Sequence, residues 1–187
     1  MGSTTWLVAW KGRRWVAKSV APIAGGQFGG GLRVAAALDA AGIPSGAPEP
    51  TCDGRPVVVV DGRPLALLRF VEGVPLAGAD PDEQRLIGHT LARAHRALRG
   101  VRVAGSERFH WVRPQADHLA LRPWIRPAVT DAVAALDESG PGSLSWGLLH
   151  ADPAPGHFLF DASTGRCGLI DWSVGWRGRC CTTWRRR

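Results

Sequence analysis

The sequence predicts an α+β protein of two lobes, a small antiparallel sheet followed by a helical half, and three observations carry that prediction. Before residue 71, apolar residues alternate with other residues at the period of two that is typical of strands. Between Leu86 and Leu98, apolar residues recur at the spacing of a helix face. Glu72-Gly73-Val74-Pro75 lies between the two regions and breaks both patterns, which makes it the candidate boundary.

The first lobe is expected to contain at least four antiparallel strands. Residues 5–20 predict a hairpin with its turn at residues 11–14, because tryptophans and valines alternate with smaller residues on both sides of a Lys-Gly pair. Residues 57–60 and 65–71 predict two more strands, with Asp-Gly turn signals on either side of the first.

One helix is expected beside this sheet, over residues 32–41. It is expected to end at Gly42, because glycine is common just after a helix. The glycine-rich residues 24–31 before it favour a flexible connector. A phosphate cradle is the alternative for this segment, because bare amides can approach an anion.

The second half is expected to be mainly helical. Asp80 is well placed to cap a helix that runs to about Arg99, since aspartate accepts hydrogen bonds from the free amides of a first turn. Residues 118–138 predict a second helical stretch, interrupted by Pro123 and Pro127.

Two polar clusters near the end of the chain are joined by an apolar hairpin. His150, Asp152 and His157 precede the strand-like residues 158–160, and Asp171 ends the return strand. Because a hairpin brings its second strand back to where the first began, we expect Asp171 to lie close to Asp152 and His157. Two carboxylates brought together at strand ends usually hold a cation or move a proton.

Length and charge limit the function classes. The chain has 187 residues, which suits one domain or two small lobes, and its formal net charge is +7. Five of the positive charges lie in the last eleven residues, which contain no acid, and removing them leaves only +2. We therefore expect no nucleic-acid partner. The five residues are Arg177, Arg179, Arg185, Arg186 and Arg187.

The sequence also predicts a soluble cytoplasmic protein with no membrane partner. No apolar run reaches the length of a membrane span, and no signal-peptide pattern opens the chain. Nothing in the sequence indicates the oligomeric state. The four cysteines lack zinc-ligand spacing and predict reduced thiols; they are Cys52, Cys167, Cys180 and Cys181.

Three motifs resemble those of a known family. His150-Ala151-Asp152 followed by Pro155-Gly156-His157 resembles a His-Gly-Asp-x-x-x-x-Asn catalytic loop. Leu169-Ile170-Asp171-Trp172 resembles a metal-binding Ile-Asp-Trp, and residues 67–76 resemble a hinge and the turn after it. Over residues 5–176 the sequence resembles the aminoglycoside phosphotransferase and choline-kinase-like branch of the protein-kinase fold.

The resemblance implies transfer of a phosphoryl group from ATP to the hydroxyl of a small molecule, so ATP and a small hydroxyl-bearing substrate are the expected partners. Asp152 would take or orient the proton of that hydroxyl. Asp171 would hold Mg²⁺ against the ATP phosphates, and Lys18 would pair with those phosphates. Main-chain groups near Arg69 and Val71 would meet the adenine.

Three positions depart from the family pattern. His157 stands where the family has its second metal ligand, an asparagine, although imidazole suits softer metals than Mg²⁺. Ala36 stands near the place of an acid that would pair with Lys18. Ala151 replaces a glycine, which matters only if the backbone there needs a positive φ.

The resemblance also implies a chain truncated at both ends. The first strand and the phosphate loop of the family would precede residue 5, and its C-terminal helices have no counterpart, so the second lobe would be incomplete. The expected units are a sheet lobe over residues 1–71, a partial helical lobe over 72–176, and a basic tail over 177–187.

The tail shows no helix or strand pattern and is expected to be disordered or frameshifted. GC-rich codons for residues 177–185, read two bases later, encode Gly-Pro-Leu-Leu-Tyr-Asp-Leu-Ala, which resembles the family's continuation after Ile-Asp-Trp. We hypothesise a frameshift near residues 175–177, and the gene sequence decides it.

Three functions are therefore open. The first is an ATP-dependent phosphotransferase, and the second is a non-catalytic remnant, or pseudokinase, with at most weak nucleotide binding. The third is a metal-binding module, because histidine and aspartate are common metal ligands. Its ligands would be His150, Asp152, His157 and Asp171.

Overall fold

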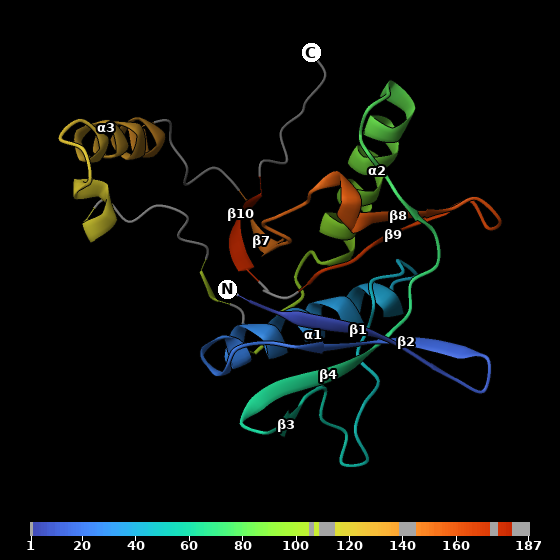
Figure 1. Cartoon of the computed structure of the whole chain (residues 1–187). Coiled ribbons are helices and arrows are strands. Elements are labelled where there is room, and N and C mark those ends of the chain that lie inside the picture. Colours follow the sequence, from blue (N-terminus) through green and yellow to red (C-terminus); the bar gives the residue numbers. More distant parts are fainter. Residues whose placement is uncertain (1, 105–106, 109–114, 139–144, 173–175, 181–187) are drawn as a thin grey trace.

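An antiparallel sheet forms the first part of the chain, as expected (Figure 1). The computed structural model describes residues 2–104, 107–108, 115–138, 145–172 and 176–180. The sheet has the strand order β1-β2-β4-β3, and every neighbouring pair in it is antiparallel. Its strands are β1 (Thr4–Trp10), β2 (Arg13–Ser19), β3 (Val58–Val60) and β4 (Arg63–Arg69).

The helix of this part, α1 (Gly25–Ala40), begins at Gly25 and not at Leu32. Both expectations for the glycine-rich segment, a flexible connector and a phosphate cradle, are therefore wrong. Gly29, Gly30 and Gly31 are buried in the helix, and a Cβ at Gly25 would meet Pro64 of β4 at 3.0 Å. Burial of these turns, with Gly25 against the sheet, offsets the low helix propensity of glycine. Sequence patterns cannot show such tertiary contacts.

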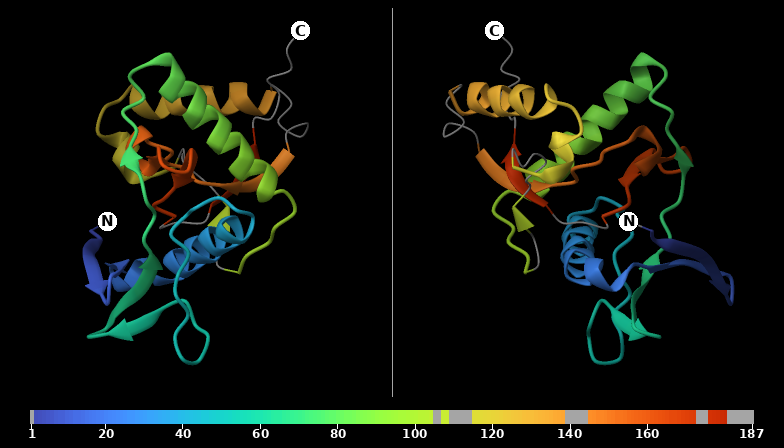
Figure 2. Two further views of the ribbon diagram at one scale, coloured as in Figure 1. Left: turned by 90° about the vertical axis from the view of Figure 1, so that its right-hand side faces the viewer. Right: turned by 60° about the vertical axis from the view of Figure 1, so that its left-hand side comes forward.

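Helix α1 lies between the sheet and the rest of the molecule (Figures 1 and 2). Its first turns contribute Phe28 and Leu32 to a small core with Val20, which follows β2, and Ala66 of β4. Its later turns belong to a larger core with residues from the second half of the chain. The helix residues in that core are Val34, Ala35 and Leu38.

The second half contains the two expected helices. In α2 (Pro81–Ala97), the Asp80 side chain accepts hydrogen bonds from the amides of Asp82 and Glu83, which confirms the predicted cap. Helix α3 (Ile125–Glu138) follows a 3₁₀ helix, and Pro123 lies between the two. The expected interruption at Pro127 is wrong, because this residue lies in the first turn of α3, where a missing N–H costs no helical hydrogen bond.

The predicted carboxylate hairpin is also present. It consists of β8 (Phe158–Asp161) and β9 (Arg166–Leu169), and β5 (Val74–Pro75) pairs with β8. The segment that breaks the sequence pattern therefore crosses from the sheet directly onto the hairpin. Gly73 makes that crossing with φ +127°, and a Cβ there would lie 2.7 Å from the Phe160 backbone.

A third sheet was not expected from the sequence. Its order is β6-β10-β7, with β6 (Glu107–Arg108), β7 (Ser145–Leu149) and β10 (Trp176–Cys180). The start of the basic tail is thus a strand, which short segments without alternation do not reveal. Residues 181–187 lie outside the described residues, so the frameshift and the proposed unit boundaries stay predictions.

Two further expectations concern membrane-spanning helices and the cysteine thiols. Among the described residues, no helix has the length and apolar character needed to cross a membrane. Cys52 is exposed, Cys167 is buried, and both are free thiols.

The hairpin packs against the segment that follows α1. The Leu169 amide donates a hydrogen bond to the Pro44 carbonyl at 2.9 Å. At the neighbouring residue, Gly168, a Cβ would lie 2.7 Å from both the Pro44 oxygen and Val71 Cγ1. Glycine at position 168 therefore allows the strand that leads to Asp171 to approach the sheet side of the molecule.

Gly168→Ala is predicted to lower the free energy of unfolding by about 1–3 kcal/mol, because the added methyl group has no space. Gly88→Ala is the matched control, since a Cβ at this α2 position meets nothing within 4 Å. It should raise the free energy by up to about 1 kcal/mol through helix propensity. Urea unfolding measures both, and equal effects of the two variants would contradict the packing argument.

Candidate active site

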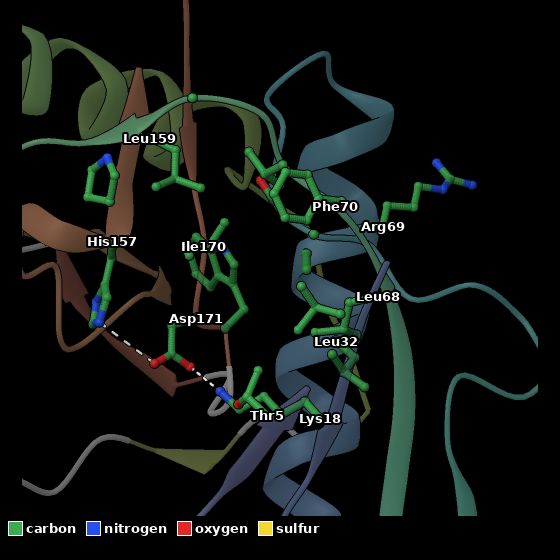
Figure 3. A pocket seen from close by; sticks show the side chains of 18 of the residues that line it. Thr5, Lys18, Leu32, Leu68, Arg69, Phe70, His157, Leu159, Ile170 and Asp171 are labelled. Atoms are coloured by element: carbon green, nitrogen blue, oxygen red, sulfur yellow. Dashed lines mark hydrogen bonds and ion pairs between the residues drawn. The ribbon is translucent and has the colours of Figure 1, made fainter. Parts of the chain in front are cut away.

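A lysine–aspartate pair joins the sheet to the end of the hairpin (Figure 3). Lys18 Nζ of β2 lies 2.5 Å from Asp171 Oδ1, across 153 residues of sequence. Only 11% of the Lys18 side chain and 35% of the Asp171 side chain are exposed. The pair is therefore partly withdrawn from water, where a charge contact is stronger than on an open surface.

His157 lies on the other side of the same carboxylate. Its Nε2 is 3.7 Å from Asp171 Oδ2, and its Nδ1 is 2.8 Å from the Asp152 carbonyl oxygen. A carbonyl oxygen can only accept, so Nδ1 carries the proton of that hydrogen bond. The expectation that Asp171 lies close to His157 is confirmed. Asp152 contributes its carbonyl group to this arrangement.

His150 holds the loop before the hairpin against the strand that follows it. Its Nε2 donates to the Ile170 carbonyl at 2.7 Å, and its ring meets Trp172 edge-on with centroids 4.5 Å apart. The Ile170 amide in turn donates to the His157 carbonyl at 2.9 Å. These contacts fix the relative positions of the loop and of Asp171. Burial lowers the pKa of His150 below its ordinary value.

Two residues of the site have left-handed backbones. Ala151 and Asp171 both have φ +67°. Aspartate tolerates this region because its side chain can bond locally, whereas alanine does not. The glycine-to-alanine departure at position 151 therefore does impose strain on the loop.

A cavity of about 410 Å³ opens in front of Asp171. Figure 3 shows Lys18, Asp171 and His157 at one end of it, Phe70 and Leu159 at the other, and Leu68 beside Leu32 along one side. Its remaining lining is mainly apolar. Among the described residues, the lining does not include Asp152, which is exposed on the loop.

The two predicted adenine contacts differ in their surroundings. Val71 is buried and lines the cavity. The Arg69 side chain points away from it (Figure 3), with Nη1 3.0 Å from Asp39 Oδ2. The Arg69 amide donates to the Ala47 carbonyl at 2.9 Å. Asp39, the acid one turn after Ala36, is thus engaged by Arg69.

The four side chains of the metal-module hypothesis do not gather into one cluster. Within the described part of the chain, no three His, Cys, Asp or Glu residues lie close enough together to hold an ion. This finding contradicts a module in which His150, Asp152, His157 and Asp171 share a metal. His150 already donates its Nε2 proton to a backbone carbonyl.

Sequence patterns missed several cavity residues. Thr5 of β1 and Phe28 and Leu32 of α1 line the cavity beside Lys18. Thr5 has no distinguishing signal in an alternating strand. The sequence does not predict a buried position for Phe28, because the glycines around it are typical of a connector.

Comparison with known proteins identifies the family. The model of the phosphotransferase enzyme family matches residues 2–185, nearly the whole chain. The chain belongs to this family. The predicted family membership is therefore confirmed, and so is the predicted two-lobed protein-kinase-like fold. A solved structure of an amicoumacin kinase in complex with AMP-PNP and Ca²⁺ has a TM-score of 0.68 at 17% identity. That alignment covers 92% of this chain and 59% of the kinase.

Curated relatives in the family include homoserine kinases. The protein from Sinorhizobium medicae is 28% identical over 131 residues, covering 66% of this chain and 40% of the relative. The protein from Rhodopseudomonas palustris is 32% identical over 153 residues, covering 75% and 45%. The chain therefore spans less than half of the length of these two relatives.

Ala151→Gly is predicted to raise the free energy of unfolding of this family member by up to about 1 kcal/mol, because glycine relieves the left-handed strain. Ala154→Gly is the control, since Ala154 has φ −60° and gains nothing from glycine. It should cost about 0.5–1 kcal/mol. Urea unfolding of both variants tests the assignment, and a loss of stability in Ala151→Gly would contradict it.

Stability is predicted to fall as the pH drops through about 6.5, the ordinary pKa of histidine, partly through His150. Because its folded pKa lies below 6.5, the unfolded chain binds the proton first as the pH falls. The contribution of neutral His150 to the free energy of unfolding is fully present above the pKa of histidine in the unfolded chain. It is lost as the pH falls toward the lower pKa of His150 in the folded protein. His150→Gln should make the dependence shallower by up to about 1.4 kcal/mol per pH unit.

Exposed His89 on α2 supplies the control, and His89→Gln should keep the original slope. Burial also lowers the pKa of His95, so some slope should remain in His150→Gln. Unfolding curves at several pH values measure the difference. Identical slopes in His150→Gln and the unmodified protein would contradict the assignment.

Proposed function

We propose that the chain carries the nucleotide site of an ATP-dependent phosphotransferase that acts on a small-molecule hydroxyl. The observation that carries the proposal is the Lys18–Asp171 pair at the polar end of a cavity whose other end is apolar. A cation and an anion at one end suit a phosphate chain and its metal ion. An apolar end suits a planar base.

The geometry supports a distinct role for each hinge residue. The Arg69 amide is already bonded to Ala47, so we assign the adenine contact to the main chain of Val71. Phe70 and Leu159 supply apolar surface at the same end, and Leu68 supplies it along one side. Lys18 would pair with the phosphates, since its ammonium group faces the cavity at the opposite end.

The side chains at the polar end include one suitable donor for a magnesium ion. Asp171 offers a hard carboxylate oxygen, and Mg²⁺ is commonly held by one or two carboxylates together with substrate phosphates and water. Asp171 therefore fits Mg²⁺ as a ligand, whereas the imidazole of His157 does not. A bound ion would neutralise charge on the phosphate oxygens. Asp171 would orient it through the oxygens that now face Lys18 and His157.

Asp152 is proposed as the group that orients the acceptor hydroxyl and takes its proton. Its exposed carboxylate can meet a substrate that arrives from solvent. Its backbone is held by the His157 hydrogen bond, and His150 holds the loop before it. A positioned carboxylate of this kind contributes through geometry and proton transfer.

Homoserine is the first acceptor to test, because the curated relatives carry that substrate in their names. These relatives are more than twice as long as the region that matches this chain, so Asp152 is the one acceptor contact that we assign. An aminoglycoside is the second acceptor, since solved structures of similar fold include aminoglycoside phosphotransferases.

A non-catalytic nucleotide binder is the second candidate function, and one observation favours it. Asp152 lies outside the lining of the cavity, and the neighbouring Ala151 is strained. A loop in this state can leave nucleotide binding intact while the acceptor hydroxyl lacks a base.

Asp152→Asn is predicted to lower phosphoryl transfer by at least about a hundredfold while ATP affinity changes less than about threefold, because the carboxylate acts on the acceptor. Calorimetry measures ATP binding, and a coupled ADP assay with homoserine or an aminoglycoside measures transfer. Asp131→Asn is the matched control, since Asp131 is exposed on α3. It should leave both quantities unchanged.

Three outcomes are informative. ATP binding with transfer that Asp152→Asn abolishes supports the enzyme. ATP binding without transfer to either acceptor supports the non-catalytic binder. Transfer that persists unchanged in Asp152→Asn would remove Asp152 from the mechanism.

A further inference from the structure

We propose that His157 and Asp171 together bind the nucleotide-associated metal ion, so that the site prefers a transition-metal ion such as Mn²⁺ to Mg²⁺. The inference rests on the proposed nucleotide site and concerns its metal selectivity. It follows from the mixed nitrogen and oxygen donors that face one another at the polar end of the cavity. Their distance, tautomer and chemistry each support it.

The hydrogen bond of His157 determines which nitrogen is available. Its Nδ1 donates to the Asp152 carbonyl at 2.8 Å, so in the neutral ring Nε2 carries the lone pair. Metal-binding histidines commonly donate the other ring N–H to a carbonyl or carboxylate, which orients the ring and makes the ligand nitrogen more basic. His157 therefore has the orientation of a metal ligand.

The gap between the two donors is suited to a cation. Nε2 of His157 lies 3.7 Å from Asp171 Oδ2, and Figure 3 shows the two groups side by side at the polar end of the cavity. Two atoms each about 2.1 Å from one ion stand about 3.0–3.5 Å apart at octahedral or tetrahedral angles. A shift of a few tenths of an ångström would bring both donors within bonding distance.

The donor types predict the order of preference. Imidazole binds first-row transition metals, with affinity rising from Mn²⁺ to Co²⁺, whereas Mg²⁺ selects oxygen ligands. Two protein donors leave several coordination positions for phosphate oxygens and water. Lys18 beside Asp171 also disfavours a lone cation. The ion should therefore bind together with the nucleotide and only weakly without it.

The experiment measures binding of the nucleotide analogue AMP-PNP by calorimetry with Mg²⁺ or Mn²⁺, and follows bound Mn²⁺ by electron paramagnetic resonance. No catalytic turnover is needed. His157→Asn replaces the imidazole by an oxygen donor of similar reach, and His89→Asn makes the same change on the exposed face of α2. Free Mn²⁺ without nucleotide is the third sample.

The unmodified chain should bind the Mn²⁺ complex at least about tenfold more tightly than the Mg²⁺ complex. His157→Asn should remove most of that ratio by weakening the Mn²⁺ complex, and His89→Asn should keep it. A Mn²⁺ spectrum that is unchanged by His157→Asn, or equal ratios in all three proteins, would overturn the inference. Absence of AMP-PNP binding with either ion would instead overturn the proposed nucleotide site.

Discussion

The Lys18–Asp171 ion pair is the contact on which the arrangement of the site depends. It joins residues 153 positions apart in the sequence and fixes the polar end of the cavity. Only 11% of the Lys18 side chain is exposed, and a buried charge is stable only when paired, because it has lost its hydration. A nucleotide and its ion would have to replace this contact with equivalent ones, phosphate for the carboxylate and metal for the ammonium group. Binding at this site is thus an exchange of partners, and its affinity is the difference between two sets of contacts.

Sequence patterns predicted the elements that are stabilised by interactions between residues close in sequence. The β1–β2 and β8–β9 hairpins follow from alternation and turn residues, and α2 follows from its Asp80 cap and apolar stripe. The start of α1 could not be predicted, because glycine has a low helix propensity and the contacts that stabilise these turns, such as that of Gly25 with Pro64, are tertiary. The β7–β10 pairing could not be predicted either, since both strands are short and their paired residues are far apart in the sequence.

The site was partly predictable for similar reasons. The hairpin places His157 beside Asp171, and that follows from strand geometry. Lys18 required the family resemblance, because an isolated lysine in a strand is more often solvent-exposed. The left-handed backbone at Ala151 and the bonded amide of Arg69 are properties of φ angles and of tertiary contacts. Neither property can be predicted from the sequence alone.

Helix α1 belongs to two hydrophobic cores of unequal size, and this has a mechanical consequence. Its later turns share the larger core with the hairpin and α2, whereas Phe28 and Leu32 share a small core with the sheet. Fewer buried apolar side chains therefore join the sheet to the first turns of α1 than join the hairpin to its later turns. If the cavity widens on binding, the sheet with Lys18 should move at a lower cost in buried contacts than the hairpin with Asp171.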